Sequence, residues 1–468
     1  MFLLRLPKVL EGAGPLRPTT IDPDEMVMDE PTYRDLEIFE GDKGPSLFDL
    51  CNSTRTTGGA KVLSTRMGTP WNKADKIRAV QESLAYVRAN RPAFERLPTA
   101  LVAHESETYL NGVLPIASSE RRFDFLVEAL GIRFGDFLPY AKIARGVQLA
   151  SKFLRSLRGL VRGLGIPAKP AQGDIAPLLT ELAALVERPA FAIVSDAEDW
   201  SVGFLTVMRV DRVFRLKERA AMERMLELAN QLDALVAMSD ANERFGWVTP
   251  ELESGPTHIA GQGLYHPFIE GPVANAVNLG DGRHVLFLTG PNMAGKTTYL
   301  RSCGIAIYLA HLGMGVPARS FRFSPCERLF SSITVTDDVR GGVSYFRAEA
   351  LRVKVIAQAV TDGHRVVALM DEPFKGTNVK DAVDASRAVL RGLIGRPGSL
   401  FLVSSHLIEL GDEMLASDRV DCCRFEADEQ EGRLLFDYVL REGVSSQRLG
   451  MRVLIEEGIF TLLDSNGP

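Results

Sequence analysis

The chain has 468 residues, of which 46% are hydrophobic, and this is enough for the cores of about two to four domains. Its formal net charge of −6 gives no global attraction to nucleic acid, so any contact with DNA needs a local basic surface. The five cysteines form no Cys-x-x-Cys pair, and no run of about 18 apolar residues occurs, which argues against a cysteine zinc site and a membrane span. We therefore expect a cytoplasmic protein.

The N-terminal half is predicted to be mostly helical. Residues 1–25 are rich in Gly, Pro and Thr and are expected to form a leader or linker. Over residues 26–250 apolar positions recur at spacings of three and four, which favours a helical domain. Within it, Ala74 to Ala89 predicts one helix and Val213 to Glu243 a long one. The buried stripe of the long helix is predicted to contain Met222, Met225, Leu226, Ala229, Leu232 and Val236.

The most basic segment of this half covers residues 137–173, which contain Lys and Arg but no acidic residue. At a rotation of about 100° per residue, five of these side chains share one broad helix face. They are Arg145, Lys152, Arg155, Arg158 and Arg162. Such a face is either a solvated helix surface or a surface that contacts the phosphates of DNA.

Residues 251–468 alternate strands and helices, and a hairpin is expected near residues 422–440. This pattern predicts a doubly wound, mainly parallel sheet with an antiparallel edge, so the fold class is α + α/β. We place the domain boundary within residues 247–255. A short buried strand is predicted for Arg283 to Thr289 and a helix for Thr298 to Leu312.

The loop between that strand and that helix has the form Gly-x4-Gly-Lys-Thr, which binds the phosphates of a nucleoside triphosphate. Its backbone N–H groups surround the phosphates at a helix N-terminus, while Lys296 reaches the β and γ phosphates and Thr297 ligates Mg²⁺. The expected nucleotide-binding residues are Gly290, Pro291, Asn292, Met293, Ala294, Gly295, Lys296, Thr297 and Thr298.

Two acidic residues follow the apolar run of residues 366–370, at the end of a second predicted strand. We expect Asp371 to hold the Mg²⁺ shell and Glu372 to polarise the attacking water, although two plain surface acids are the alternative. His406, which follows a third predicted strand at Leu400 to Ser404, is expected to donate to a γ phosphate. Together these residues predict an Mg²⁺-dependent ATPase.

Several segments resemble the MutS family of DNA mismatch repair ATPases, which belongs to the ABC-type ATPases. The 290–297 loop is similar to that of the family, and residues 337–349 resemble its signature segment. Residues 369–372 and 375–377 follow in the same order. The helical half is similar to the family's core domain through residues 26–29, 36–38 and 231–236, and residues 443–450 resemble the end of its ATPase domain.

The resemblance implies a homodimer in which the signature serine, Ser344, completes the γ-phosphate site of the partner subunit. ATP would then close the dimer. The chain departs from the family in four respects. No mismatch-reading domain with a Phe-x-Glu wedge is expected before Met26, and no nuclease domain after Gly458. Val343 and Tyr345 stand where the signature has Arg and Thr, and Pro272 lies near the place of an adenine-stacking aromatic residue.

Two functions fit this sequence. The first is an ATPase that couples dimer closure to binding of duplex, mismatched or branched DNA in repair or recombination. The second is an ATP-dependent protein-interaction switch that does not bind DNA directly.

Overall fold

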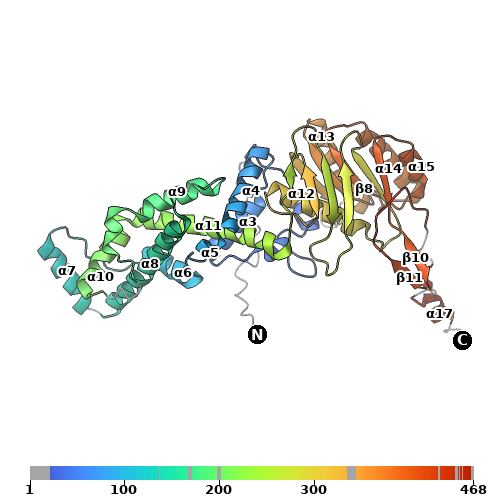
Figure 1. Cartoon of the computed structure of the whole chain (residues 1–468). Helices are drawn as coiled ribbons and strands as arrows, with labels where there is room; N and C mark the ends of the chain where they lie inside the picture. Colours follow the sequence, from blue (N-terminus) through green and yellow to red (C-terminus); the bar gives the residue numbers. More distant parts are fainter. Residues whose placement is uncertain are drawn as a thin grey trace.

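The chain forms an elongated molecule with helices at one end and sheets at the other (Figure 1). This computed structural model describes residues 22–135, 137–166, 171–197, 202–334, 344–430, 433–447, 452, 454–455 and 457–464. Most of the predicted leader, Lys169 of the basic segment, residues 337–343 of the signature segment and residues 448–450 lie outside the described residues.

The helical end contains α-helices interrupted by two other helical segments. The α-helices are α1 (Glu30–Asp35), α2 (Leu47–Cys51), α3 (Thr57–Gly68), α4 (Ala74–Ala89), α5 (Arg91–Phe94), α6 (Ala100–Asn111), α7 (Arg122–Phe134), α8 (Phe137–Leu164), α9 (Ile175–Val186), α10 (Phe204–Arg212) and α11 (Arg219–Phe245). A 3-10 segment, η1 (Pro189–Ile193), precedes α10, and a π-helical segment, η2 (Val213–Lys217), follows it.

The long helix α11 joins the outer part of this end to the sheets, with α3 and α4 packed along it (Figure 1). All six residues of its predicted stripe are buried. The predicted start at Val213 is wrong, because residues 213–217 are π-helical and the α-helix begins only at Arg219. The Gly246 N–H caps the C-terminus of α11 in a left-handed conformation that glycine adopts without steric cost.

The outer part of the helical end is formed by α6, α7, α9 and α10 around the 28-residue helix α8 (Figure 1). The apolar face of α8 is buried, through Val147, Phe153 and Leu157 among others. None of the helices in the described parts of the chain combines the length and apolar character needed to cross a bilayer.

In the described residues, the other end contains twelve strands and the remaining helices. The strands are β1 (Glu251–Leu252), β2 (Ile259–Leu264), β3 (Asn275–Leu279), β4 (Val285–Thr289), β5 (Ser320–Phe323), β6 (Arg328–Ser332), β7 (Val366–Asp371), β8 (Leu400–Ser404), β9 (Val420–Arg424), β10 (Ala427–Gln430), β11 (Arg433–Phe436) and β12 (Arg441–Glu442). The helices are α12 (Lys296–His311), α13 (Tyr345–Thr361), α14 (Val379–Ile394), η3 (Ile408–Leu410), α15 (Gly411–Leu415) and α17 (Ile459–Asp464).

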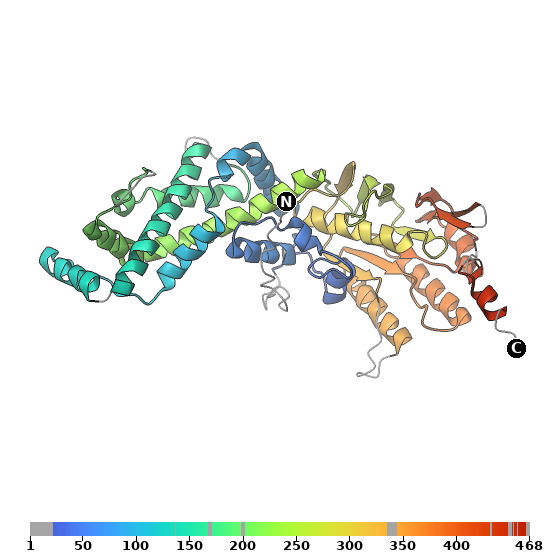
Figure 2. The same cartoon turned by 90° about the horizontal axis from the view of Figure 1, so that it is seen from below.

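The main sheet has the order β12-β9-β4-β8-β7-β6, and its strands are parallel except for β12, which pairs antiparallel with β9 at the edge. Alternate residues face opposite layers. Leu286, Leu288 and Leu369 belong to the core that contains α12, whereas Phe287 and Met370 belong to the core with α13 and α14. Figure 2 shows the sheet between these two layers of helices. The predicted parallel sheet with an antiparallel edge is therefore present.

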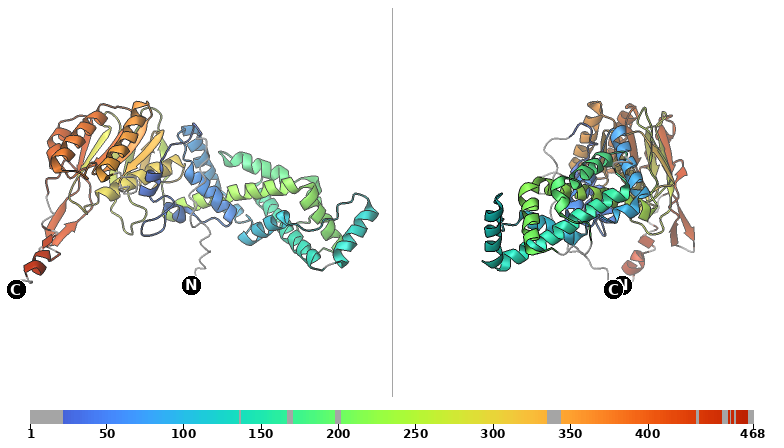
Figure 3. Two further views of the ribbon diagram at one scale, coloured as in Figure 1. Left: turned by 180° about the vertical axis from the view of Figure 1, so that it is seen from behind. Right: turned by 60° about the vertical axis from the view of Figure 1, so that its left-hand side comes forward.

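Two features of this end differ from the prediction. A second sheet of order β1-β5-β2-β3 packs beside α12 and was not predicted. The expected hairpin is formed by β10 and β11, but these strands make a separate two-stranded sheet, and the antiparallel edge is supplied by the short β12. The hairpin and α17 project away from the main sheet (Figure 3).

Candidate functional site

The 290–297 loop connects the end of β4 to the start of α12, as predicted. Two glycines permit its shape. Gly290 has φ 142° and a Cβ there would lie 2.7 Å from the Phe425 carbonyl oxygen, while Gly295 has φ 103° and caps α12. The N-terminus of the 16-residue helix α12 therefore opens toward the loop, and such a terminus favours an anion.

Lys296 is buried and its ammonium group points back into the 290–297 loop. Its Nζ donates to the Gly290 carbonyl at 2.8 Å and the Pro291 carbonyl at 3.1 Å, and lies 3.3 Å from Glu372 Oε1. A buried cation held by carbonyl groups and one carboxylate is well placed to exchange partners with a phosphate.

Thr297 and Asp371 form a hydrogen-bonded pair where α12 begins and β7 ends. The Thr297 hydroxyl donates to Asp371 Oδ2 at 2.6 Å, and the Ser404 hydroxyl at the end of β8 donates to Asp371 Oδ1. A hydroxyl and a carboxylate are hard oxygen donors of the kind that Mg²⁺ prefers. The residues therefore fit the predicted cation, and Ser404 is a supporting residue that the sequence did not single out.

Glu372 follows Asp371 and lies between the side chains of Lys296 and His406. His406 Nδ1 is 3.4 Å from Glu372 Oε2, on the side opposite to the Lys296 contact. The Glu372 backbone has φ 49°, and its N–H donates to Ser404. Hydrogen bonding to His406 and the charge of Lys296 lower the pKa of Glu372 to about 2, although burial opposes this shift. Glu372 is thus a carboxylate throughout the physiological pH range.

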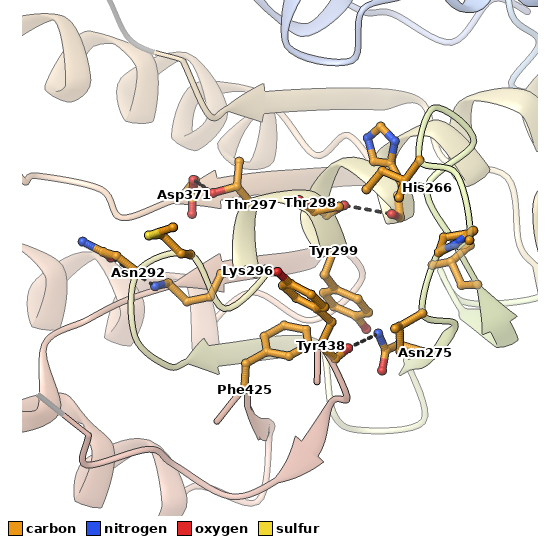
Figure 4. A pocket seen from close by; sticks show the side chains of 18 of the residues that line it. His266, Asn275, Asn292, Lys296, Thr297, Thr298, Tyr299, Asp371, Phe425 and Tyr438 are labelled. Atoms are coloured by element: carbon orange, nitrogen blue, oxygen red, sulfur yellow. Dashed lines mark hydrogen bonds between the residues drawn. The ribbon is translucent and has the colours of Figure 1, made fainter. Parts of the chain in front are cut away.

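A cavity of about 700 Å³ adjoins the loop and contains Lys296, Thr297, Asp371 and Glu372 in its wall (Figure 4). The rest of the lining includes Pro272, which the sequence analysis named, and five residues that it did not name. They are His266, Asn275, Tyr299, Phe425 and Tyr438. Figure 4 shows the Tyr299, Phe425 and Tyr438 rings gathered beside Lys296. One end of the cavity is therefore charged and the other largely aromatic.

Asn275 and Tyr438 hold each other in place. The Tyr438 carbonyl accepts from Asn275 Nδ2 at 3.0 Å, and a Cβ on Gly295 would lie 3.3 Å from the Tyr438 ring. Burial lowers the pKa of His266 to about 4, so this imidazole is neutral at physiological pH. Tyr438 lies within residues 422–440, the segment predicted as a hairpin, but only tertiary folding brings it over the 290–297 loop.

Ser344 lies apart from this cavity, because the cavity wall does not include it. It is exposed at the start of α13, where its side chain makes no capping hydrogen bond to the helix. Among the described residues, Ser344 is therefore an exposed hydroxyl at the N-cap position of the 17-residue helix α13.

The predicted basic face of α8 is smaller than helical rotation suggested. Arg158 is only 7% exposed, and its guanidinium donates to the carbonyls of Val186, Phe191 and Val194. Arg158 is therefore a structural residue and is not available to phosphate. The rotation argument failed because η1 and the end of α9 cover this part of the helix.

The other four residues of that face have different surroundings. Arg145 and Lys152 are exposed, with Arg145 3.4 Å from Glu105. Arg162 pairs with Asp196 at 2.7 Å, and Arg155 is half-buried. The exposed positive charge of α8 is thus concentrated around Arg145 and Lys152.

The sequence was compared with family models and with known proteins. The family model described as MutS domain V matches residues 286–459, which include the 290–297 loop, Asp371, Glu372 and His406. The DNA mismatch repair protein MutS of Brevibacillus brevis is 31% identical over 264 residues. Residues 286–459 therefore belong to the MutS domain V family. The similarity covers 53% of this chain and 30% of the Brevibacillus MutS, so the chain spans about a third of that relative.

Proposed function

We propose that this MutS-family chain is an Mg²⁺-dependent ATPase that closes as a homodimer on ATP and couples closure to DNA binding. The observation that carries the proposal is the meeting of Lys296, Thr297, Asp371 and Glu372 in one cavity at the carboxyl ends of β4 and β7. In this proposal residues 251–468 are the P-loop ABC-type ATPase domain and residues 26–250 the helical core domain.

The charged end of the cavity suits the triphosphate. Lys296 would leave the Gly290 and Pro291 carbonyls and Glu372 for the β and γ phosphates, while the N-terminus of α12 faces the same anion. Thr297 and Asp371 would hold Mg²⁺, which neutralises charge on the phosphates during transfer. The aromatic end, with Tyr438 and Phe425, would hold the nucleobase.

Glu372 is the group we assign to the attacking water. It is ionised, and the loss of Lys296 to the phosphates would raise its pKa toward that of an effective proton acceptor. His406, whose side chain is 51% exposed and lies 3.4 Å from Glu372 Oε2, would both orient this carboxylate and donate to the γ phosphate.

The second subunit would supply Ser344. Its side chain is exposed at the N-terminus of α13 and makes no capping hydrogen bond to that helix, which suits a role on a γ phosphate outside the chain. Nucleotide binding and dimer contact would then be one coupled equilibrium. The DNA contact would use Arg145 and Lys152, with Arg162 and Arg155 contributing less because of their ion pair and burial.

A protein-interaction switch is the second candidate, and one observation favours it. Helix α7 buries Phe125 and Ala129 against the other helices, yet its opposite face exposes a stripe with spacing four, three, four. In that stripe Phe123 is 74% exposed and Phe134 77% exposed, with Val127 and Leu130 between them. A helix with apolar residues on both faces is typical of a protein contact.

The trans arrangement is tested by complementation. Ser344→Ala and Lys296→Ala should each be inactive alone, whereas a mixture should regain about a quarter of the wild-type rate, because half of the randomly mixed dimers contain one complete site. An inactive mixture, measured at concentrations where wild-type subunits exchange, would show that Ser344 does not act across a dimer.

A further inference from the structure

Ser331, near the end of β6, has every backbone and side-chain polar group bound by residues from two helices. Its N–H donates to Thr32 Oγ1 at 2.9 Å, its hydroxyl donates to Asp35 Oδ2 at 2.7 Å, and its carbonyl accepts from Arg352 Nε at 2.7 Å. Thr32 and Asp35 lie in α1, near the N-terminus, and Arg352 lies in α13. One fully buried serine therefore joins three elements that are distant in sequence.

Asp35 extends this junction along the chain toward residue 334. Its carboxylate, in a side chain only 2% exposed, accepts from the N–H of Ile333 at 2.9 Å and of Thr334 at 3.0 Å. Thr334 is the last described residue before Ser344. Asp35 thus fixes the backbone on the N-terminal side of the segment that leads to Ser344.

Arg352 holds the C-terminal side of the same segment. It lies two turns after Ser344 in α13, with its side chain 10% exposed, and its guanidinium pairs with Asp29 and donates to Thr32 Oγ1 at 3.0 Å. Its guanidinium carbon Cζ also lies 5.7 Å from the centre of the Phe330 ring. A planar guanidinium with several fixed partners restricts the position and rotation of the helix that carries it.

The segment from Asp29 to Glu37 also contacts α12 and the helical half. Glu37 Oε1 accepts from Arg301 at 2.9 Å, and Arg301 is one turn after Thr297 in α12. The Tyr33 hydroxyl donates to the Gly68 carbonyl at the end of α3, which packs along α11. Figure 2 shows α13 on the side of the sheet next to this blue N-terminal region.

We propose that Asp35 and Arg352 are positioning residues that hold Ser344 in the orientation needed by the partner subunit's nucleotide. The inference rests on the proposed function, since it assigns a role to Ser344 in trans. It makes the N-terminal α1 part of the ATPase machinery of the other subunit. It also gives the helical half, through α3 and α1, a direct mechanical connection to Ser344.

The test uses Arg352→Met in the full chain. We expect kcat to fall about 10- to 100-fold, because a small displacement of a positioned group has such an effect, while the Kd for ATP stays within about twofold. Arg91→Met removes a comparable bidentate pair, Arg91 with Asp240, elsewhere in the helical half and should leave kcat unchanged. Equal losses in both variants, or a loss of ATP affinity alone, would overturn the proposal.

Mixing experiments separate positioning in trans from general damage. Arg352→Met retains its own 290–297 loop, so a mixture with Lys296→Ala should regain activity, whereas a mixture with Ser344→Ala should not. If Ser344→Ala complements Lys296→Ala but Arg352→Met does not, the proposal is wrong and the proposed function stands. If the wild type does not hydrolyse ATP, the proposed function itself fails.

A second variant covers the case in which Arg352→Met does not fold. Thr32→Val removes the hydroxyl that accepts hydrogen bonds from the Ser331 N–H and the Arg352 guanidinium, but it keeps the shape of this fully buried side chain. Thr32→Ser keeps the hydroxyl and is its matched control. The valine variant should reproduce the kcat loss and the mixing pattern, and the serine variant should keep most of the wild-type rate. Equal rates for the two variants would overturn the proposal.

Discussion

Lys296 Nζ lies 3.3 Å from Glu372 Oε1, so the two residues with the most direct roles in the proposed reaction neutralise each other. The side chains are 5% and 16% exposed, which makes an unpaired charge at either position costly. In the proposed mechanism ATP would have to separate this pair, because its phosphates would compete with Glu372 for the ammonium group. The contact therefore links phosphate binding to the state of the carboxylate that would activate water.

Replacing Lys296 by Ala should abolish nucleotide binding. We expect saturating Mg²⁺·ATP at about 100 times its Kd to stabilise the wild type by about 2.7 kcal/mol, and the variant by nothing measurable. Thermal or denaturant unfolding with and without ATP measures this. Lys354→Ala, at an exposed site on α13, is the control and should respond like the wild type. If ATP stabilised Lys296→Ala as much as the wild type, Lys296 would not be part of the nucleotide site.

Glu372→Gln should bind ATP and accumulate as a dimer. The amide frees Lys296 from its ion pair and cannot accept a proton, so ATP should bind at least as tightly while hydrolysis nearly stops. Light scattering after size-exclusion chromatography measures the mass with and without ATP. A variant that stays monomeric with bound ATP would contradict dimer closure.

The pKa of Glu372 predicts a pH dependence of stability. Its folded value of about 2 lies below the usual 4.5, so the ionised group stabilises the fold above about pH 4.5, and this contribution is lost as pH falls toward 2. From the size of the shift the contribution is at most about 3 kcal/mol. The difference in unfolding free energy between wild type and Glu372→Gln, measured by denaturant titration, should be constant above pH 5 and shrink below it.

Glu349→Gln is a comparison variant for which the pH dependence of the stability difference should have the opposite sign. Burial raises the pKa of Glu349, so its ionisation opposes folding at neutral pH, and Glu349→Gln should gain stability relative to wild type as pH rises. A Glu372→Gln difference that grows on acidification would show that the ion pair does not stabilise the folded chain.

Charge reversal on α8 should weaken DNA binding without changing unstimulated hydrolysis. Arg145→Glu with Lys152→Glu removes two exposed cations, and each lost phosphate contact should reduce the slope of log K against log salt by about 0.9. Binding to labelled duplex at several salt concentrations measures both quantities. Lys380→Glu with Arg396→Glu, at exposed sites beyond β7, matches the change in net charge and should have little effect.

Identical DNA affinity in both double variants would remove α8 from the DNA interface. In that case α7 becomes the part of the helical end to examine, because its exposed apolar stripe suits a protein contact.

The local elements were predictable where a single periodicity dominates. The strand at Leu400 to Ser404 and the helix at Ala74 to Ala89 have the predicted bounds, because each is a continuous run with clear ends. The 290–297 loop was predictable because glycine is required where φ is positive and the backbone approaches Phe425.

The remaining features depend on contacts between distant parts of the chain. Helical rotation placed Arg158 on an open face, but the carbonyls of residues 186–194 cover it. Tyr438 reaches the cavity only because the segment after the hairpin returns to Asn275. Likewise, nothing local in the sequence links Asp35 to Ser331, almost 300 residues away, since the link requires α1 to pack against β6.

The most direct test of the account is the steady-state rate of ATP hydrolysis by the wild type and by Glu372→Gln, each alone and with homoduplex, mismatched duplex or four-way junction. We predict Mg²⁺-dependent hydrolysis by the wild type, a change in its rate with at least one DNA, and a rate at least about 100-fold lower in the variant. Hydrolysis that is equal in the two proteins, or absent from the wild type under every condition, would contradict the assignment of this cavity as an ATPase site.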